Sequence, residues 1–228
     1  MIRVAIDGPS GAGKSTVAKQ IAKDLSIIYV DTGAMYRSIG LYILRKGLDT
    51  KDAAQVTDCL SSIDLQTRYD PANGQRIYLN GEDVSEAIRT PEASMAASNV
   101  SAIPAVRAFL LELQQTMAKK QSLVMDGRDI GTVVIPDAEL KIFLTASPES
   151  RAHRRYLEYV QKGQPAEYEE ILRDVIQRDH QDSTRAAAPL RQAEDAVLLD
   201  TTTINFEQTV TLIKQMILEK AKELGCSI

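Results

Sequence analysis

The sequence predicts an α/β protein built on a five-stranded parallel sheet with helices on both faces. Short apolar runs typical of buried strands alternate with longer segments of helical periodicity. A glycine-rich segment, residues 8–13, joins the first apolar run to the first helical segment. One stretch, residues 62–100, breaks this alternation, and we expect it to be a small antiparallel insertion in the parallel fold.

The predicted elements follow from hydrophobic periodicity along the chain. Apolar runs predict strands at 2–6, 27–30, 123–125, 140–144 and 197–199. A 3.6-residue period, as in Val17, Ile21 and Leu25, predicts helices at 14–25, 34–45, 104–119, 148–160, 168–178 and 206–224. Ser147 and Asn205 each precede one of these helices and are predicted N-caps.

The insertion is distinguished by period-two alternation and turn dipeptides. Residues 65–84 alternate, and Asn73-Gly74 and Asn80-Gly81 mark tight turns, so the sequence predicts a small antiparallel sheet. A helix is predicted to begin at Thr90-Pro91-Glu92. We therefore divide the chain into a core, residues 1–61 and 101–228, and an inserted subdomain, residues 62–100.

Composition restricts the class of protein. With 228 residues, 44% of them hydrophobic, and a net charge of −4, the chain has the make-up of a globular protein rather than of a dedicated nucleic-acid binder. No apolar run reaches the ~18 residues that a membrane span needs. Cys59 and Cys226 form no CxxC pair, which favours a reducing compartment. Because a strand is predicted from residue 2, we expect no signal peptide and a cytoplasmic location.

The glycine-rich segment has the pattern of a phosphate-binding loop. Two glycines, Gly8 and Gly13, are separated by four residues and are followed by Lys and Ser, between a predicted strand and a predicted helix. In such loops the backbone N–H groups surround phosphate oxygens, the lysine neutralises them and the hydroxyl ligates Mg²⁺. The predicted ATP-binding residues are Gly8, Pro9, Ser10, Gly11, Ala12, Gly13, Lys14, Ser15 and Thr16.

A second group of polar residues follows the predicted strand at 123–125. Asp126 is the carboxylate expected beside a magnesium–nucleotide complex, so Ser15 and Asp126 are the predicted metal ligands. Arg128 and Asp129 come directly after it, at the carboxyl end of a strand. Seven of the fifteen arginines lie within residues 151–191, and arginine is favoured where phosphates are held.

A phosphate loop leaves several functions open. The chain has no Asn-Lys-x-Asp motif, which disfavours a switch GTPase, and a transporter ATPase would need a longer chain. A small-molecule kinase must bring two negatively charged phosphate groups together. Because these groups repel each other, such an enzyme needs cations at its site, which accounts for the arginines. Two alternatives remain. One is a kinase for another small acceptor, and the other is a non-catalytic, RNA-associated NTPase.

Five motifs together resemble the bacterial cytidylate kinase family. They are Ile6-Asp-Gly-Pro-Ser-Gly-Ala-Gly-Lys-Ser-Thr16, Asp31-Thr-Gly-Ala-Met-Tyr-Arg37, Asp126-Gly-Arg-Asp-Ile-Gly-Thr132, Arg151-Ala-His-Arg-Arg155 and Arg185-Ala-Ala-Ala-Pro189. They stand in the family's order over essentially the whole chain. The resemblance implies a phosphate-loop kinase fold with a subdomain for the nucleoside monophosphate at residues 62–100 and a short lid at about 151–170.

The resemblance also implies substrates and site residues. The donor would be ATP with Mg²⁺, and the acceptor would be CMP or dCMP. Phosphate binding falls to Arg37, Arg128 and Arg185, with Arg178 between phosphate and sugar; the other CMP-binding residues would be Thr32, Ser98, Arg107, Asp129 and Asp182. Of these, Ser98, Arg107 and Asp129 would read cytosine, and Asp182 the ribose. The implied catalytic residues are Lys14, Arg128, Arg178, Arg185, Arg151 and Arg155, and the lid arginines are Arg151, Arg154 and Arg155.

The hydrogen-bonding groups of cytosine are consistent with recognition of this base by a carboxylate. Cytosine presents an amino donor, which Asp129 can accept, whereas uracil presents an acceptor there and would leave a buried carboxylate without a partner. We expect no nucleic-acid or membrane partner, and we expect a monomer.

Overall fold

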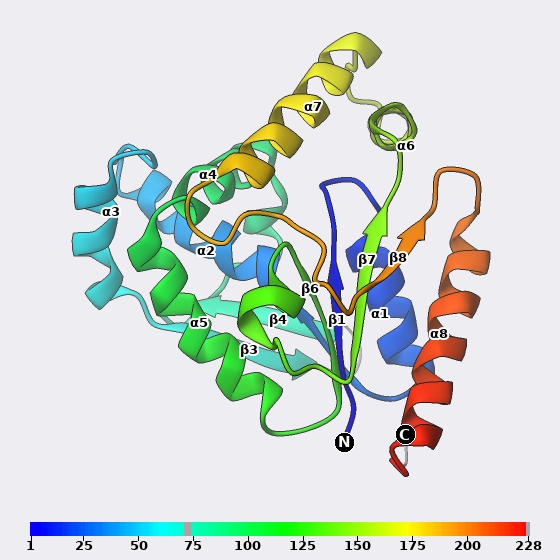
Figure 1. The fold of residues 1–228 in the computed structure, drawn as a ribbon. Coiled ribbons are helices and arrows are strands. Elements are labelled where there is room, and N and C mark those ends of the chain that lie inside the picture. The colour runs from blue at the N-terminus through cyan, green and yellow to red at the C-terminus, as the bar shows by residue number, and fades with distance from the viewer. Residues whose placement is uncertain (71–73, 227–228) are drawn as a thin grey trace. The chain divides into compact units, whose positions relative to one another are not determined.

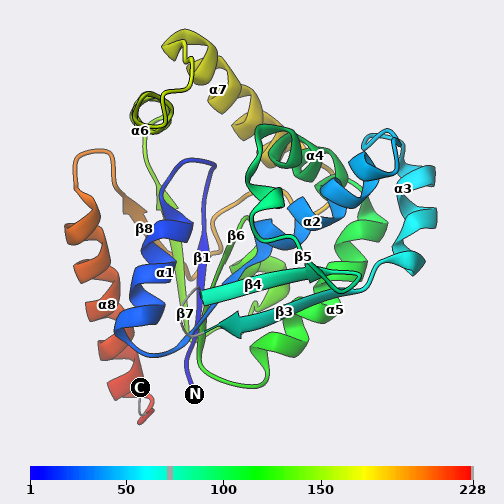
Figure 2. The ribbon, with the colours of Figure 1, turned by 180° about the vertical axis from the view of Figure 1, so that it is seen from behind.

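The computed structural model describes residues 1–70 and 74–226, and Figures 1 and 2 show its elements from opposite sides. The main sheet contains β1 (Arg3–Asp7), β2 (Ile28–Asp31), β6 (Leu123–Gly127), β7 (Leu140–Thr145) and β8 (Val197–Asp200), in the order β2-β6-β1-β7-β8. Strand β1 pairs in parallel with β6 and β7, and β7 pairs in parallel with β8. The five-stranded parallel sheet is therefore confirmed.

The chain forms two compact units. The first consists of Met1–Ile28 and Gln121–Ile228, and the second of Tyr29–Lys120. In the first unit Val4, Ala5 and Ile6 are all fully buried. Successive residues of a strand point to opposite faces, so both faces of the sheet are covered along β1.

The helices of the first unit are α1 (Lys14–Asp24), α6 (Pro148–Gln161), α7 (Tyr168–Thr184) and α8 (Phe206–Glu223). Helix α1 packs against β6 and α8, and α6 packs against α7 (Figure 1). Ala152, Ile171 and Val175 form the buried centre of the α6–α7 contact. Both predicted N-caps are confirmed, because the Ser147 hydroxyl accepts from Ser150 N and Asn205 forms a capping box with Gln208.

The second unit combines helices with the small antiparallel sheet. Its helices are α2 (Thr32–Arg45), α3 (Ala53–Cys59), α4 (Pro91–Ser101) and α5 (Pro104–Ala118), with short 3₁₀ turns η1 (Leu60–Ser62) and η2 (Ala87–Arg89). The sheet has the order β3 (Leu65–Asp70), β4 (Gly74–Leu79) and β5 (Glu82–Asp83), as Figure 2 shows. Positive φ angles of 50° at Asn80 and 84° at Gly81 confirm that predicted turn. The other predicted turn includes Asn73, which lies outside the described residues.

Three elements differ from the predictions. Helix α3 was not predicted, because Val56 is its only large apolar residue and its only buried one, and a single such side chain creates no periodic pattern. Helix α7 continues past the predicted end at Arg178 to Thr184, through residues that are mostly polar. A single π-helical turn, η3 (Ile130–Val134), follows β6. Such turns are frequent at functional sites.

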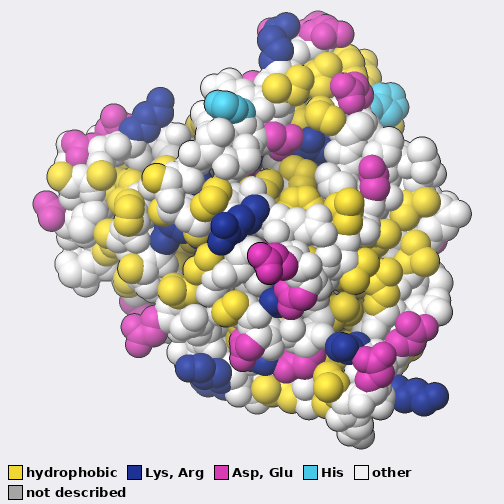
Figure 3. All heavy atoms as spheres, viewed as in Figure 1, with side chains coloured by type: hydrophobic (Ala, Val, Ile, Leu, Met, Phe, Trp, Pro, Cys, Tyr) yellow, Lys and Arg dark blue, Asp and Glu magenta, His cyan; other side chains and the backbone are white. Residues whose placement is uncertain are grey.

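Charged side chains of both signs are mixed on the surface. On the face shown in Figure 3, Asp and Glu side chains are interspersed with those of Lys and Arg, as the net charge of −4 would suggest. Within residues 1–70 and 74–226, no single helix is long and apolar enough to cross a membrane. Helices α4 and α5 meet the length and composition criteria only as a pair, which is bent by 100°.

The packing of α2 on α4 predicts an effect for Gly40→Ala. A Cβ atom at Gly40 would lie 2.7 Å from Ala96 Cβ and 3.0 Å from the Ala97 backbone nitrogen. Alanine favours helix by about 1 kcal/mol over glycine, yet overpacking costs roughly 1–3 kcal/mol, so we expect a net loss of stability of up to about 2 kcal/mol. Urea denaturation would measure it. Adding Ala96→Gly should restore part of the loss, and additive effects in the double variant would contradict this contact.

Candidate functional site

The phosphate loop connects β1 to α1 in a conformation that requires glycine. Gly8 has a φ angle of +148°, and a Cβ atom there would lie 1.9 Å from the carbonyl oxygen of Leu144. Gly13, with a φ angle of +89°, precedes α1 and provides no side-chain cap. The first turn of α1 also contains no acidic residue. The backbone N–H groups at this helix start therefore suit an external anion.

Lys14 is the first residue of α1 and is only 5% exposed. Its Nζ atom donates to the carbonyl oxygen of Pro9 at 2.7 Å. Burial and the positive charge of Arg128 lower the pKa of Lys14 to about 7, against the opposing effect of nearby carboxylates including Asp126 and Asp182. A bound polyphosphate would favour the charged amine, so this lysine is suited to a highly anionic ligand.

The two predicted metal ligands lie together. The Ser15 hydroxyl donates to Asp126 Oδ2 at 2.8 Å, and Asp126 is 4% exposed at its position in β6. A hydroxyl and a carboxylate are oxygen donors of the kind that Mg²⁺ prefers when phosphates and water complete its coordination. The described residues contain no cluster of three or more His, Cys, Asp or Glu side chains placed to hold a metal. Ser15 and Asp126 thus supply two oxygen donors of the kind that suits a magnesium–nucleotide complex.

A network of arginines and carboxylates lies in the same unit as the phosphate loop. Arg128 Nε donates to Asp182 Oδ2 at 2.8 Å, and Arg185 Nη1 lies 3.8 Å from Asp182 Oδ1. Arg185 Nη2 lies 3.7 Å from Asp129 Oδ1. Burial tends to raise the pKa of Asp182, but the charges of Arg128, Arg178 and Arg185 lower it overall. The structure thus brings all five predicted acceptor-site residues of this unit into one electrostatic network.

Asp7, at the end of β1, supports this network and was not among the predicted site residues. Its carboxylate accepts from the backbone N–H of Ile130 at 2.8 Å and from that of Gly131 at 2.7 Å. It therefore holds the start of η3, directly after Asp129. Burial raises the pKa of Asp7 to about 6, although the two backbone hydrogen bonds oppose this. The sequence signal was an ionisable residue at the end of a buried strand, next to Gly8.

Two of the three arginines predicted for the lid contact other parts of the protein, and the third contacts its own helix. Arg151 is 3% exposed and donates to the carbonyl oxygen of Ser10 in the phosphate loop at 2.9 Å. It also forms a two-pronged ion pair with Asp179 on α7. Arg154 donates to Thr201, and Arg155 donates to the Tyr159 hydroxyl. Arg151 therefore links the phosphate loop to α6 and α7, and Asp179 is a partner that the sequence did not indicate.

The remaining predicted residues belong to the second unit. Thr32 is the first residue of α2, and Arg37, one turn later, pairs with Asp31 at 3.0 Å. Ser98 and Arg107 each contact Ser101 at the end of α4, because the Ser101 hydroxyl donates to the Ser98 carbonyl oxygen and Arg107 Nη1 donates to that of Ser101. The guanidinium of Arg107 also lies 5.6 Å from the centre of the Tyr36 ring. Polar groups from α2, α4 and α5 are therefore gathered within this unit.

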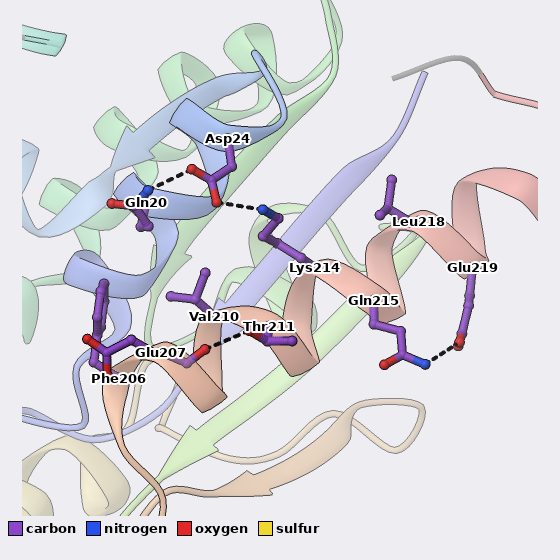
Figure 4. Close-up of a pocket in the computed structure, with 10 residues that line it drawn as sticks. All are labelled: Gln20, Asp24, Phe206, Glu207, Val210, Thr211, Lys214, Gln215, Leu218 and Glu219. Carbon is purple, nitrogen blue, oxygen red and sulfur yellow. Dashed lines mark hydrogen bonds and ion pairs between the residues drawn. The ribbon is translucent and has the colours of Figure 1, made fainter.

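A surface groove between α1 and α8 has a volume of about 540 Å³ (Figure 4). Polar groups on its lining are bonded to one another, since Lys214 pairs with Asp24 at 2.6 Å and Gln20 donates to the same carboxylate. Phe206 and Leu218, 39% and 50% exposed, supply apolar surface. None of the predicted site residues lines this groove.

The fold and the phosphate loop together define a nucleotide-binding protein of the phosphate-loop kinase class. The chain belongs to the cytidylate kinase family, because the family model described as "Cytidylate kinase" matches residues 4–219. This confirms the resemblance seen in the motifs.

Curated relatives agree with this assignment, and a solved structure shares the fold. The chain is 47% identical to the cytidylate kinase of Caldicellulosiruptor bescii, over 97% of each sequence. It is 50% identical to that of Carboxydothermus hydrogenoformans, over 95% of this chain and 97% of the relative. An uncharacterized protein from Eubacterium ventriosum has a similar fold, with a TM-score of 0.51 at 11% identity over 95% of this chain and 98% of that one.

The buried carboxyl group of Asp7 predicts an unusual pH dependence. Its folded-state pKa of about 6 exceeds the ordinary value of 3.8, so the folded protein binds more protons than the unfolded chain between these values. The contribution of Asp7 to stability is therefore greatest below about pH 4 and falls as the pH rises through about 6, by about 3 kcal/mol at most. In Asp7→Asn this loss is absent. Urea unfolding would measure the unfolding free energy of both proteins across this range. As the pH rises, the unfolding free energy of the variant should increase relative to that of the wild type. A difference that is constant with pH would contradict the prediction.

Proposed function

We propose that this protein transfers the γ-phosphoryl group of ATP to CMP or dCMP, forming ADP with CDP or dCDP. The observation that carries the proposal is the combination of a buried phosphate-loop lysine, Lys14, with the network in which Arg128 and Arg185 contact the buried carboxylates of Asp129 and Asp182 in the same unit. Such an arrangement supplies positive charge for two phosphate-bearing substrates together with a carboxylate that can read a base.

We assign the donor end to the phosphate loop. The backbone N–H groups of the loop and of the start of α1, together with the amine of Lys14, would bind the β- and γ-phosphates of ATP. Ser15 and Asp126, whose side chains are hydrogen-bonded, would hold Mg²⁺, which neutralises charge on the phosphate oxygens. Arg151 donates to the Ser10 carbonyl and would keep the loop in its binding conformation.

We assign the acceptor roles that the family resemblance implies. Arg37, Arg128 and Arg185 would bind the phosphate of the monophosphate, and Arg178 would assist between phosphate and sugar. In-line alignment of this phosphate with ATP is the main catalytic requirement, because phosphoryl transfer passes through a loose transition state. Asp129 would accept the cytosine amino group, while Ser98 and Arg107 would complete base recognition. Asp182 would contact the ribose hydroxyls, and Thr32 would be a further CMP-binding residue.

We extend the proposal to the organisation of the chain. Residues 62–100 would act as the nucleoside monophosphate-binding subdomain. Residues 151–170, which carry Arg154 and Arg155, would act as a lid that excludes water during transfer. We propose that the protein works in the cytoplasm as a monomer.

The first experiment compares acceptors. ADP formation from MgATP should be rapid with CMP and dCMP and slow with UMP, AMP, GMP and shikimate. Fast turnover with shikimate or another acceptor would contradict the proposal and would indicate a kinase for that acceptor. ATP hydrolysis that no acceptor stimulates, together with salt-dependent RNA binding, would favour the RNA-associated NTPase.

Asp129→Ala tests the recognition of the base. We expect kcat/KM for CMP to fall about 100-fold or more, because a buried charge-assisted hydrogen bond is lost, while the ratio of CMP to UMP activity collapses. Steady-state kinetics with both nucleotides would measure this. A variant that loses activity but keeps the wild-type preference for CMP would contradict the assigned role.

The lowered pKa of Lys14 predicts that the protein takes up a proton when it binds a nucleotide. With a pKa of about 7 in the free protein, the amine is largely neutral at about pH 8, and bound phosphates raise its pKa. Binding of MgATP should therefore take up close to one proton at about pH 8 and fewer below about pH 7. Calorimetry in buffers of different ionisation enthalpy measures this number. Lys23→Met, an exposed change on the same helix, should retain the uptake, and a wild-type value near zero would contradict the prediction.

A further inference from the structure

The small antiparallel sheet places one polar side chain in contact with the residue that precedes α2. Gln75 is the second residue of β4, and its Oε1 atom accepts from the backbone N–H of Asp31 at 2.8 Å. All of these residues lie in the second unit, where α2 packs on β4 (Figure 2). Because an N–H group requires an acceptor, this bond determines the orientation of the amide. The NH₂ group of Gln75 is therefore the end of the amide that does not face the Asp31 N–H group.

Two donors in this region are buried without a partner. Within the part of the chain that the structure describes, neither Gln75 Nε2 nor Arg37 Nε has a hydrogen-bond partner, and both atoms are inaccessible. Leaving a buried donor without an acceptor destabilises the protein, and more so when the donor is charged. Both side chains are bonded to Asp31, Gln75 through the backbone and Arg37 through the carboxylate. Two such costs next to one residue indicate a place where a ligand supplies the acceptors.

The charge balance specifies the kind of acceptor. Arg37 lies 3.0 Å and Arg89 lies 3.8 Å from the Asp31 carboxylate. Two guanidinium groups against one carboxylate leave one positive charge in this group. Both unsatisfied atoms are donors only, so the missing partner is an acceptor, and the charge favours an anionic one.

We propose that Gln75 is a substrate-binding residue whose Nε2 atom donates a hydrogen bond to a phosphate oxygen of the nucleoside monophosphate, beside Arg37 Nε. This inference rests on the proposed function, and it adds a residue from the small sheet to the arginines assigned above. It gives β4 a direct role in substrate binding. The Gln75–Asp31 bond then serves to orient the donor before the phosphate arrives.

Gln75→Glu separates this role from a structural one. Glutamate keeps an oxygen that can accept from Asp31 N–H, but it replaces the NH₂ donor by a second carboxylate oxygen. Near Arg37 and Arg89 we expect the new group to be ionised at about pH 8 and to repel the phosphate. The KM for CMP should therefore rise about 20-fold or more, while the KM for ATP stays within about twofold of wild type.

The matched control is Gln66→Glu, the same change at an exposed position on β3 of the same sheet. It should leave both KM values unchanged. Calorimetry provides a second readout without turnover: Gln75→Glu should weaken binding of CMP but leave binding of cytidine, which lacks the phosphate, at the wild-type value. Equal weakening of both ligands would mean that Gln75 only supports the fold, and an unchanged affinity for CMP would mean that water satisfies its donor. Either result would overturn the proposal.

Failure of the proposed function would look different. In that case the wild-type protein itself would show no turnover with CMP. If wild-type turnover is rapid and Gln75→Glu matches the Gln66→Glu control, the proposed function stands and only the role of Gln75 is wrong.

Discussion

The candidate site depends on the pairing of arginines with buried or half-buried carboxylates. Asp182 holds Arg128 and Asp179 holds Arg151 in the first unit, and Asp31 holds Arg37 in the second. A free arginine side chain loses roughly 2 kcal/mol of rotamer entropy when it is immobilised. Arginines that are already held avoid most of that loss when a ligand binds. The carboxylates also reduce the mutual repulsion of several guanidinium groups, which makes the charge cluster compatible with folding.

The electrostatics of the first unit are suited to an anionic ligand. Burial and Arg128 lower the pKa of Lys14, and burial raises that of Asp7. Each group is thus biased toward its neutral form in the free protein. Phosphate groups would reverse the bias on the lysine, so the site gains its full positive charge only when its substrate is present. Asp7 meanwhile holds η3 through two backbone hydrogen bonds, which ties the position of Asp129 to the end of β1.

The recognition groups that we propose in the second unit are positioned by a different structural route. Its arginines and hydroxyls are placed by helices α2, α4 and α5, whereas Gln75 is placed by a strand. The strand can reach Asp31 because β4 packs on α2. An insertion of this kind can add a substrate contact without altering the phosphate loop, since the two belong to separate compact units.

The sequence alone was sufficient to predict the phosphate loop, its flanking strand and helix, and the order of strands and helices in the chain. These features are local, because they depend on residues a few positions apart and on the period of the apolar residues. The motifs were also sufficient to indicate the family. Helix α3 and the end of α7 were missed, since each contains few apolar residues that could reveal a period.

Only the tertiary structure identified Asp7, Asp179 and Gln75. Asp7 acts on a residue 123 positions away, Asp179 on one 28 positions away, and Gln75 on one 44 positions away. No periodicity or spacing rule connects such pairs, because the contacts are created when strands and helices pack. A glutamine in an alternating strand reads as an ordinary surface residue until burial of its amide nitrogen is known. The local chemistry could therefore be predicted from the sequence, whereas the pairing of distant polar groups was decided by the tertiary structure. Only folding determines which hydrogen-bond donors are removed from water.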